Sequence, residues 1–424
     1  MLTLNVLRGE SDRVIERLKV KGIDATETVA KIAELDDLRK SLQQRADAAG
    51  AELNNIAKEV GRLFKEGKTE EANKAKERTA GLKEEARKLD DELKQAQSAL
   101  DALIVTLPNL PADDVPVGMT AEDNVVVRQG GAQVTLPEGA LPHWELASKY
   151  DIIDFELGNK LTGAGFPVYK GLGARLQRAL IAFFLDRNTS AGYTEVLPPI
   201  MVNEASGFGT GQLPDKEGQM YHATQDNFYM IPTAEVPVTN IYRDVIVAEK
   251  DLPVKMTAYT PCFRREAGSY GKDVRGLNRL HQFDKVEIVR IEKPENSWPA
   301  LDEMVMHVES IVKDLELPYR ILRLCGGDMS FTSAMTYDFE VYSSAQGRWL
   351  EVSSVSNFES FQANRLKLRY RDADKKPQLA HTLNGSSLAL PRIVAALLEN
   401  NQTPEGIRLP AVLVPYMGGI EYIR

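Results

Sequence analysis

The sequence has only two cysteines, Cys262 and Cys325, among its 424 residues. Two thiols cannot form a cysteine-based zinc site, so we expect no zinc and expect oxygen ligands for any bound metal. We interpret both cysteines as small buried apolar side chains in a reducing compartment. Long apolar runs are also absent, since no stretch reaches the roughly 18 residues that a membrane span needs. Charge begins within the opening MLTLNVLRGESD, too early for a signal peptide. The sequence therefore predicts a cytoplasmic protein with no membrane association.

The chain also lacks an excess of basic residues, because 52 lysines and arginines face 61 aspartates and glutamates, a net charge of −9. This balance excludes a protein that is basic over its whole surface, although nucleic-acid binding also depends on local patches and on shape. A chain of this length with 43% apolar residues exceeds one typical core. We therefore expect two domains, with a boundary in the proline-containing stretch 108–140.

Proline is missing from residues 26–107, which carry two heptad runs. Apolar residues recur there at alternating spacings of three and four, over residues 42–63 and again over residues 72–103, which is typical of coiled coils. Gly61 and Gly67 interrupt the pattern and predict a turn between antiparallel helices. An arm of about 35 residues would extend roughly 50 Å. Periodicity alone favours a dimerisation coiled coil as the simplest interpretation.

A cationic, glycine-rich loop lies between two predicted strands at residues 259–263 and 283–289, in the sequence YTPCFRREAGSYGKDVRGLNRLHQFDKVEIV. The pattern predicts a β-hairpin with a long loop. Glycines let a backbone approach a ligand closely, and planar guanidinium groups bind phosphate or carboxylate oxygens with bidentate geometry. A nucleoside triphosphate is the ligand that this chemistry favours. A surface hairpin with scattered ion pairs is the alternative.

Before this hairpin the sequence predicts a helix over about residues 172–191 and a strand over residues 192–201 that two prolines close. Residues 228–235 then predict an apolar strand that ends in a polar turn. Thr233 and Glu235 lie in that turn, where a hydroxyl and a carboxylate can meet a small polar ligand. The same pattern is also common as an ordinary helix cap.

After the hairpin, residues 298–315 predict an amphipathic helix, and residues 337–342 and 349–357 predict two strands. A regular second strand would put Glu351 and Ser353 on one face and Ser354 on the other. A carboxylate beside hydroxyls is a suitable site for a hard cation. An exposed polar strand face is the simpler explanation.

The last segment, residues 381–400, predicts a strand end, a polar turn and a buried helix. Arg392 is the only charged residue among the apolar residues at the start of that helix. A charge in such a place needs a partner. Either an internal ion pair or an anionic ligand would satisfy it.

The hairpin, with Phe263-Arg264-x-Glu266, GSYGKDVRGL and HQFDKVE, resembles motif 2 of class II aminoacyl-tRNA synthetases, specifically the bacterial-type seryl-tRNA synthetases. The similarity extends over essentially the whole chain: the helix and strand before Pro199 resemble motif 1, and residues 381–400 resemble motif 3. It implies an α+β fold, an antiparallel β-sheet flanked by helices and preceded by an N-terminal antiparallel coiled-coil arm. It also implies a homodimer, with a tRNA-binding domain at residues 1–110 and a class II catalytic domain at residues 111–424.

The resemblance implies that serine and ATP form seryl-adenylate, from which tRNA(Ser) takes the seryl group; tRNA(Sec) is a further candidate acceptor. Arg264 would fix the α-phosphate and the serine carboxylate, whereas Arg279 and Arg392 would hold the β- and γ-phosphates. The residues matching the family's ATP contacts are Arg264, Arg265, Glu266, Leu280, Phe283, Glu351, Val352, Ser353, Ser354 and Arg392. Those matching its serine contacts are Thr233, Ala234, Glu235, Arg264, Glu287 and Ser386. Glu351 and Ser354 match its magnesium ligands.

In this family an arm of this kind grips the long extra arm of the cognate tRNA. Charges along residues 37–101 are nearly balanced, so we expect the arm to read shape, with Arg62, Lys65 and Lys68 near its tip as candidate contacts. Two alternatives stay open. A paralogue that activates an amino acid for a non-tRNA acceptor would not need the arm. A non-enzymatic coiled-coil protein would not need Arg264, Glu266, Glu351 and Arg392 together.

Overall fold

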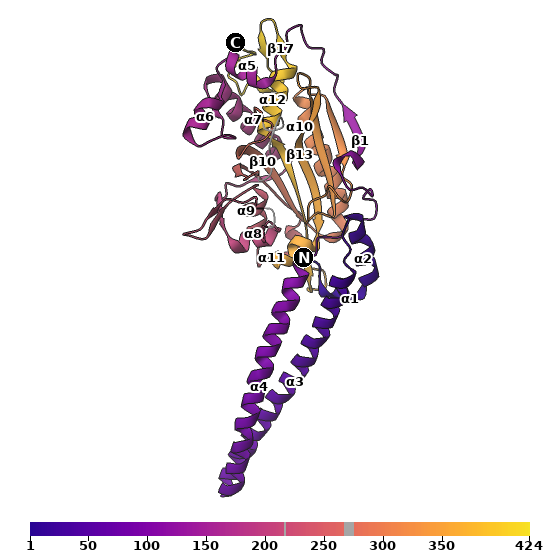
Figure 1. The fold of residues 1–424 in the computed structure, drawn as a ribbon, viewed down its shortest axis with the longest axis vertical. Helices are drawn as coiled ribbons and strands as arrows, with labels where there is room; N and C mark the ends of the chain where they lie inside the picture. Colours follow the sequence, from indigo (N-terminus) through magenta and orange to yellow (C-terminus); the bar gives the residue numbers. More distant parts are fainter. Residues whose placement is uncertain (216–217, 267–274) are drawn as a thin grey trace. The chain divides into compact units, whose positions relative to one another are not determined.

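Figure 1 shows the computed structural model, which describes residues 1–215, 218–266 and 275–424. The chain forms two compact units. One unit comprises Met1–Lys19 and Ile23–Pro108, and the other comprises Val20–Gly22 and Asn109–Arg424. Among the described residues, no helix is both long enough and apolar enough to cross a membrane.

The first unit is helical, and its four helices are α1 (Leu4–Gly9), α2 (Ser11–Val20), α3 (Thr26–Lys65) and α4 (Thr69–Ile104). The long helices α3 and α4 run side by side as an antiparallel pair (Figure 1). Every seventh residue of α3 is buried against α4 through the predicted heptad, at Leu42, Ala49, Ile56 and Leu63. The ion pair between Arg78 Nη2 and Glu52 Oε1 (3.3 Å) bridges the two helices. The predicted coiled-coil arm is confirmed.

Residues 1–25 contain the two short helices α1 and α2, and the Thr3 hydroxyl accepts a hydrogen bond from Val6 N (3.3 Å) at the start of α1. The turn of the arm differs in one detail from expectation. Gly61 lies inside α3, so only Gly67, with φ of +77°, adopts the left-handed conformation of the turn. A glycine inside a helix costs about 1 kcal/mol, which the packing of a long helix pair can offset.

The second unit is built on an eight-stranded sheet of order β1-β11-β12-β13-β16-β10-β9-β4. Its strands are β1 (Val125–Gly130), β4 (Thr194–Glu195), β9 (Val254–Phe263), β10 (Gln282–Glu292), β11 (Tyr319–Arg323), β12 (Met335–Ser343), β13 (Arg348–Glu359) and β16 (His381–Ala389). Neighbouring strands are antiparallel, apart from β4 beside β9. Strands β9 and β10 pair from Phe263–Gln282 to Val254–Ile291, so the predicted hairpin is confirmed.

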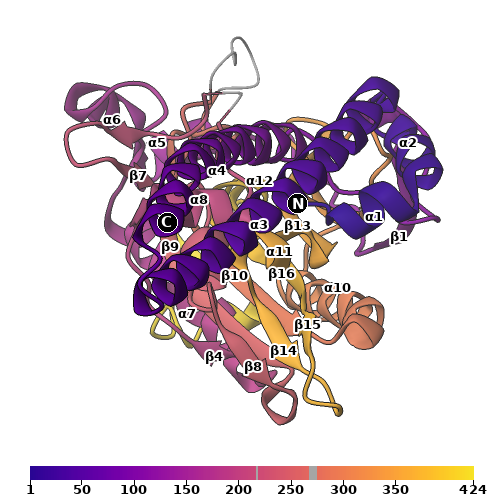
Figure 2. The same cartoon turned by 90° about the horizontal axis from the view of Figure 1, so that it is seen from below.

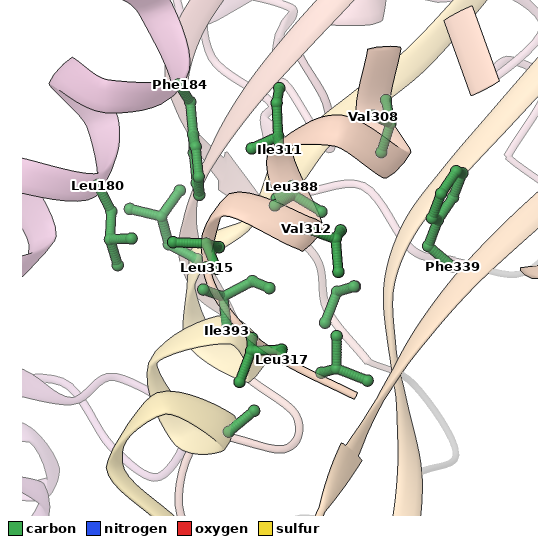
Figure 3. Packing of buried hydrophobic residues seen from close by; sticks show 14 of the residues in the cluster. Leu180, Phe184, Val308, Ile311, Val312, Leu315, Leu317, Phe339, Leu388 and Ile393 are labelled. Carbon is green, nitrogen blue, oxygen red and sulfur yellow. The ribbon is translucent and has the colours of Figure 1, made fainter. Parts of the chain in front are cut away.

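Three helices bury one face of this sheet: α7 (Gly171–Ser190), α10 (Ser297–Asp314) and α12 (Leu390–Asn400). Figure 3 shows apolar side chains from these helices and the strands packed together, among them Leu180, Phe184, Val308, Ile311, Phe339 and Ile393. Each of these side chains is fully buried. Burial of such a side chain contributes roughly 1.5–3 kcal/mol, so this cluster fixes the sheet against its helices.

Alternation along β10 separates this core from the opposite face of the sheet. Val286 and Ile288 belong to the core under the three helices. Successive side chains of a strand point to opposite faces, so Lys285 and Glu287 lie on the other face. Val289 follows them there and packs in a second cluster with Ala234. Lys285 and Glu287 therefore lie on the face that α7, α10 and α12 do not cover, whereas Asp284 and Arg290 lie on the helix side and contact Gln177 of α7 (3.0 Å) and Glu303 of α10 (2.6 Å).

Four smaller sheets occur in the described part of this unit, and Figure 2 shows that of β8, β14 and β15. Their strands are β2 (Ile153–Asp154) with β3 (Val168–Tyr169); β5 (Met201–Asn203), β6 (His222–Ala223) and β7 (Phe228–Met230); β8 (Ile246–Ala248), β14 (Arg369–Arg371) and β15 (Pro377–Leu379); and β17 (Gln402–Thr403), β18 (Gly406–Arg408) and β19 (Tyr422–Ile423). The remaining helices are α5 (His143–Lys149), α6 (Phe155–Leu161), α8 (Glu204–Thr210), α9 (Glu235–Asn240) and α11 (Ser360–Leu366).

The strand predicted over residues 192–201 is divided in the structure. Its first part, β4, pairs with β9, whereas β5 begins at Met201 and belongs to another sheet. The pairing stops because Pro198 and Pro199 have no N–H group to donate.

The polar turn predicted within residues 381–400 is also wrong, because β16 continues to Ala389 and α12 follows at once. Leu388 has φ of +76°, a rare conformation for a residue other than glycine. The strand alternation is interrupted there. Ser387 donates to Asn188 Oδ1 of α7 (3.0 Å), and Leu388 also enters the core. Pro391 lies in the first turn of α12, where the missing N–H group of proline is tolerated.

Candidate active site

Four buried polar side chains meet on the face of the sheet opposite α7, α10 and α12: Thr233, Glu235, Lys285 and Glu287. We call these four residues the polar cluster. Lys285 Nζ donates to Thr233 Oγ1 (2.7 Å) and lies 2.7 Å from Glu287 Oε2. The Thr233 hydroxyl lies 3.5 Å from the same carboxylate oxygen. All four residues are between 2% and 7% exposed, so their charges interact strongly.

Glu235 is the residue of the polar cluster whose pKa is changed by its surroundings. Burial, and after it the charge of Glu287, raises the pKa of Glu235 to about 7, although Gln362 and Asn384 donate hydrogen bonds to it. The Gln362 bond is 2.6 Å long. With both carboxyls ionised and one ammonium present, the polar cluster has one negative charge in excess. A cationic ligand group would balance that charge.

Arg264 connects the polar cluster with the two ends of the cationic loop. Its Nε donates to the carbonyl of Pro232, the residue before Thr233 (3.3 Å), and its guanidinium lies over the ring of Phe283 (5.2 Å). Glu266 and Arg279 form an ion pair across the loop ends. Residues 267–274, with the predicted glycines 268 and 271 and Lys272, lie outside the described residues.

A β-bulge brings Glu351 and Ser354 together on β13. Phe339 pairs with Ser353, but the next residue of β12 pairs with Glu351, so Val352 is an extra residue. As a result Glu351 and Ser354 share a face, and Ser354 Oγ donates to Glu351 Oε1 (3.4 Å). We call Glu351 and Ser354 the oxygen pair.

The expectation that Ser353 shares a face with Glu351 is therefore wrong. Ser353 is buried, and its hydroxyl donates to the carbonyl of Ser386 (2.5 Å). Asp338 lies directly across the ladder from Ser354, and its buried Oδ1 has no hydrogen-bond partner among the described residues. Burial, and after it the charge of Glu351, raises the pKa of Asp338.

Arg392 has the partner that its position requires. Its Nη1 donates to the carbonyl of Glu351 (2.8 Å), and its Nε donates to the carbonyl of Asn278 (3.0 Å). The Glu351 carboxylate lies 3.8 Å away. Arg392 therefore joins the oxygen pair to the end of the cationic loop, next to Arg279.

The remaining predicted residues have different surroundings. Ser386 pairs across the ladder with Glu287, which places it beside the polar cluster. Arg265 is exposed, and its backbone N–H donates to Gln219 O (2.8 Å). Three predicted residues have buried apolar side chains and offer a polar ligand only their backbone: Ala234, Leu280 and Val352.

Lys285, Gln362 and Asn384 also belong to the site, although they were not among the predicted residues. A signal for Lys285 was present, because a residue two positions before Glu287 on a strand lies on the same face. Gln362 gave no local signal, since it reaches Glu235 from α11 and only tertiary packing brings the two together.

The tip of the arm carries the three cations predicted to contact tRNA. Glu66 lies 3.8 Å from Arg62 Nε and 3.3 Å from Lys68 Nζ. Lys65 is also exposed. The tip is thus partly neutralised, which favours recognition of shape over simple attraction of phosphate.

Residues 1–111 match the family model described as seryl-tRNA synthetase N-terminal domain, and residues 219–401 match the tRNA synthetase class II core domain (G, H, P, S and T). A serine–tRNA ligase of Salinibacter ruber is 52% identical over 99% of this chain and 98% of its own. The chain belongs to the seryl-tRNA synthetase family. A serine–tRNA ligase of Trichlorobacter lovleyi is 46% identical over the whole of both chains.

Solved structures place the fold in the same family. Pyrococcus horikoshii seryl-tRNA synthetase complexed with ATP has a TM-score of 0.92 at 32% identity, covering 99% of each chain. The cytoplasmic serine–tRNA ligase of Naegleria fowleri in complex with AMP has a TM-score of 0.88 at 26% identity, covering 100% of this chain and 99% of that chain. The predicted seryl-tRNA synthetase resemblance and class II fold, with its paired N-terminal helices, are confirmed.

Proposed function

We propose that this chain activates L-serine with ATP to form seryl-adenylate and pyrophosphate, and then transfers the seryl group to tRNA(Ser), with tRNA(Sec) as a further acceptor. Relatives that match over the full chain are named serine–tRNA ligase. The observation that carries the proposal is the polar cluster beside Arg264. Together they offer acceptors for an ammonium, partners for a hydroxyl and a guanidinium for a carboxylate or phosphate.

The polar cluster, with Ser386, would recognise serine. Its excess negative charge favours the ammonium group, and its buried oxygens offer partners for the side-chain hydroxyl. Alanine and glycine lack that hydroxyl and would leave buried groups unpaired. Such a loss allows discrimination of as much as ~10⁴–10⁵-fold.

Serine binding should depend on pH through Glu235. The pKa of Glu235 in the folded protein is raised from 4.5 to about 7, so its carboxyl is neutral below pH 7. Its ionisation is disfavoured in the folded state, so folding stability falls as the pH rises from 4.5 to about 7. An ammonium prefers the ionised form. We expect the KM for serine to rise about tenfold per pH unit below 7. In Glu235→Gln the KM should be higher but independent of pH; a parent KM that is constant from pH 6 to 8 would contradict this role.

Adenylate formation would depend on positioning and charge neutralisation instead of a dedicated base. Arg264 would bridge the α-phosphate and the serine carboxylate, as its place beside Thr233 supports. Arg279 and Arg392 would hold the β- and γ-phosphates, and their contacts with Glu266 and Asn278 restrict the directions of the two guanidinium groups.

The oxygen pair is suited to magnesium, because a carboxylate and a hydroxyl on one strand face are hard oxygen ligands. No group of three or more His, Cys, Asp or Glu residues that could hold a metal occurs in the part of the chain that the structure describes. Phosphate oxygens of ATP would therefore complete the coordination shell. Magnesium bound there would neutralise charge on the phosphates.

Arg264→Lys tests the bidentate contact. Lysine keeps the positive charge but lacks the planar guanidinium that makes two parallel hydrogen bonds. We therefore expect serine-dependent ATP–pyrophosphate exchange to fall by at least about tenfold. The measurement is the initial rate at saturating and subsaturating serine and ATP. Unchanged exchange kinetics would remove Arg264 from the centre of the mechanism.

The first domain, residues 1–110, would bind tRNA through its arm, and residues 111–424 would perform catalysis as a homodimer. A paralogue with a non-tRNA acceptor would also carry out exchange. Charging of total tRNA with serine separates the two functions.

A further inference from the structure

A fully buried histidine–glutamate pair lies outside the residues assigned to ligands. His143, the first residue of α5, and Glu399, near the end of α12, both have fully buried side chains. His143 Nδ1 lies 2.7 Å from Glu399 Oε1, and the backbone N–H of His143 donates to the same oxygen (3.0 Å). The other oxygen, Oε2, accepts from Ser343. Burial by itself would raise the pKa of Glu399, but the bonds from His143 and Ser343 hold it below its usual value.

The contacts of His143 fix its tautomer. Leu277 N donates to His143 Nε2 (2.8 Å), so Nε2 must carry a lone pair. The ring proton then lies on Nδ1, where it is donated to Glu399. A neutral, oriented imidazole thus holds the backbone at the end of the cationic loop.

The neighbouring residues of this loop end also contact the start of α5. The guanidinium of Arg275 lies over the ring of Trp144 (4.6 Å). Gly276 has φ of +65°, and a Cβ there would lie 2.2 Å from His143 Nε2. The chain therefore passes directly over the imidazole, at a position that only glycine fits.

A second route connects the same pair to Arg392. Gln346 donates to Glu399 Oε1 (3.1 Å) and accepts from Asn278 Nδ2 (3.0 Å). The carbonyl of Asn278 accepts from Arg392 Nε (3.0 Å). Arg392 lies near the start of α12 and Glu399 near its end, so hydrogen bonds connect both ends of this helix to the loop residues Leu277 and Asn278.

We propose that His143 and Glu399 are positioning residues for the ATP site: they fix Leu277 and Asn278, and through the Asn278 carbonyl they fix the guanidinium of Arg392. This inference rests on the proposed function, in which Arg392 holds ATP phosphates. Misplacement of a binding group by about 1 Å can cost as much as ~10²-fold in rate. A loss here should therefore affect ATP and spare serine, whose proposed contacts lie in the polar cluster.

Two variants of His143 separate its two contacts. His143→Asn retains a donor near the Nδ1 position but cannot reach Leu277, whereas His143→Gln places an amide oxygen near the Nε2 position. In ATP–pyrophosphate exchange we expect the KM for ATP to rise roughly tenfold in His143→Asn and no more than about threefold in His143→Gln. The KM for serine should stay within about twofold in both.

A merely structural role predicts a different result, in which both variants lose thermal stability and active fraction together and neither KM changes selectively. That outcome would overturn the inference. Gln346→Ala removes the second route and one hydrogen bond to Glu399 but keeps the bond between His143 and Glu399, so it provides the test if His143→Asn does not fold. Its KM for ATP should rise by about threefold, and an unchanged value would count against the route.

A double-variant comparison tests whether the effect passes through Arg392. We expect His143→Asn to weaken ATP binding in calorimetry, but to add little in an Arg392→Ala background. Full additivity would overturn the coupling. Absence of serine-dependent exchange in the parent protein would refute the proposed function itself, whereas normal exchange in the parent with an unaltered KM for ATP in the variants would refute only this inference.

Discussion

Glu287→Ala is expected to reduce serine-dependent ATP–pyrophosphate exchange by roughly 10²-fold or more, with ATP binding largely kept. Glu287 is 2% exposed and lies 2.7 Å from Lys285 Nζ, so its removal leaves a buried ammonium without its carboxylate. The proposed contact between Glu287 and the serine ammonium would also be lost, and loss of a buried, hydrogen-bonded charge pair costs about 2–5 kcal/mol of binding, where each 1.4 kcal/mol is a factor of ten. The ATP contacts proposed at Arg279, Arg392 and the oxygen pair are unaffected. Exchange kinetics and ATP calorimetry on the same preparation measure the two effects.

Glu309→Ala is the matched control, because Glu309 is also a buried carboxylate. It contacts Tyr319 of β11 (2.6 Å) and Lys313 of α10 (3.1 Å). This variant should lose stability and keep exchange within about twofold. If Glu287→Ala exchanged within a few-fold of the parent, Glu287 would have to be dropped as a serine contact. If exchange fell equally in Glu287→Ala and Glu309→Ala, the cause would be a general loss of stability.

Removal of the outer arm should abolish efficient tRNA charging and leave serine activation nearly unchanged. The variant deletes Gln43 to Arg87 and joins Leu42 to Lys88 by a two-residue turn. Leu42 and Leu89 belong to one apolar cluster, so the cut ends lie close together across the helix pair. A docked module typically contributes several kcal/mol, so aminoacylation should fall by roughly 10²-fold or more.

A second variant, with Arg62, Lys65 and Lys68 all replaced by alanine, separates charge from shape at the tip. Because Glu66 already neutralises part of this charge, we expect a loss of less than tenfold, much smaller than that of the deletion. If the deletion variant charged tRNA at the parent's rate, the arm would be a spacer or an oligomerisation element and not a tRNA-binding element. Loss of exchange as well, with circular dichroism showing a folded core, would contradict the independence of the two domains.

The features that the sequence predicted well depend on local periodicity. The heptads of residues 42–63 recur every seven residues, and the structure buries Leu42, Ala49, Ile56 and Leu63 accordingly. The hairpin around the cationic loop was also predictable, since two apolar strands flank it. In both cases the pattern has the period of the element that it forms.

The errors arise where the backbone departs from that period. The extra residue Val352 rotates Ser354 onto the face of Glu351 and buries Ser353, and nothing in the local pattern marks a bulge there. Leu388 takes φ of +76° although it is not glycine, so β16 reaches α12 without the predicted turn. Gln362 meets Glu235 through tertiary packing alone. Such features depend on contacts between segments far apart in sequence.

The central claim is most directly tested by ATP–pyrophosphate exchange with each of the twenty standard amino acids, followed by charging of total tRNA with the active ones. Serine alone should support strong exchange, because alanine and glycine leave the polar cluster unpaired. The charged tRNA should be tRNA(Ser), with tRNA(Sec) where it is present. Exchange that serine does not stimulate, or strong exchange with serine and no charging of any tRNA, would contradict the account.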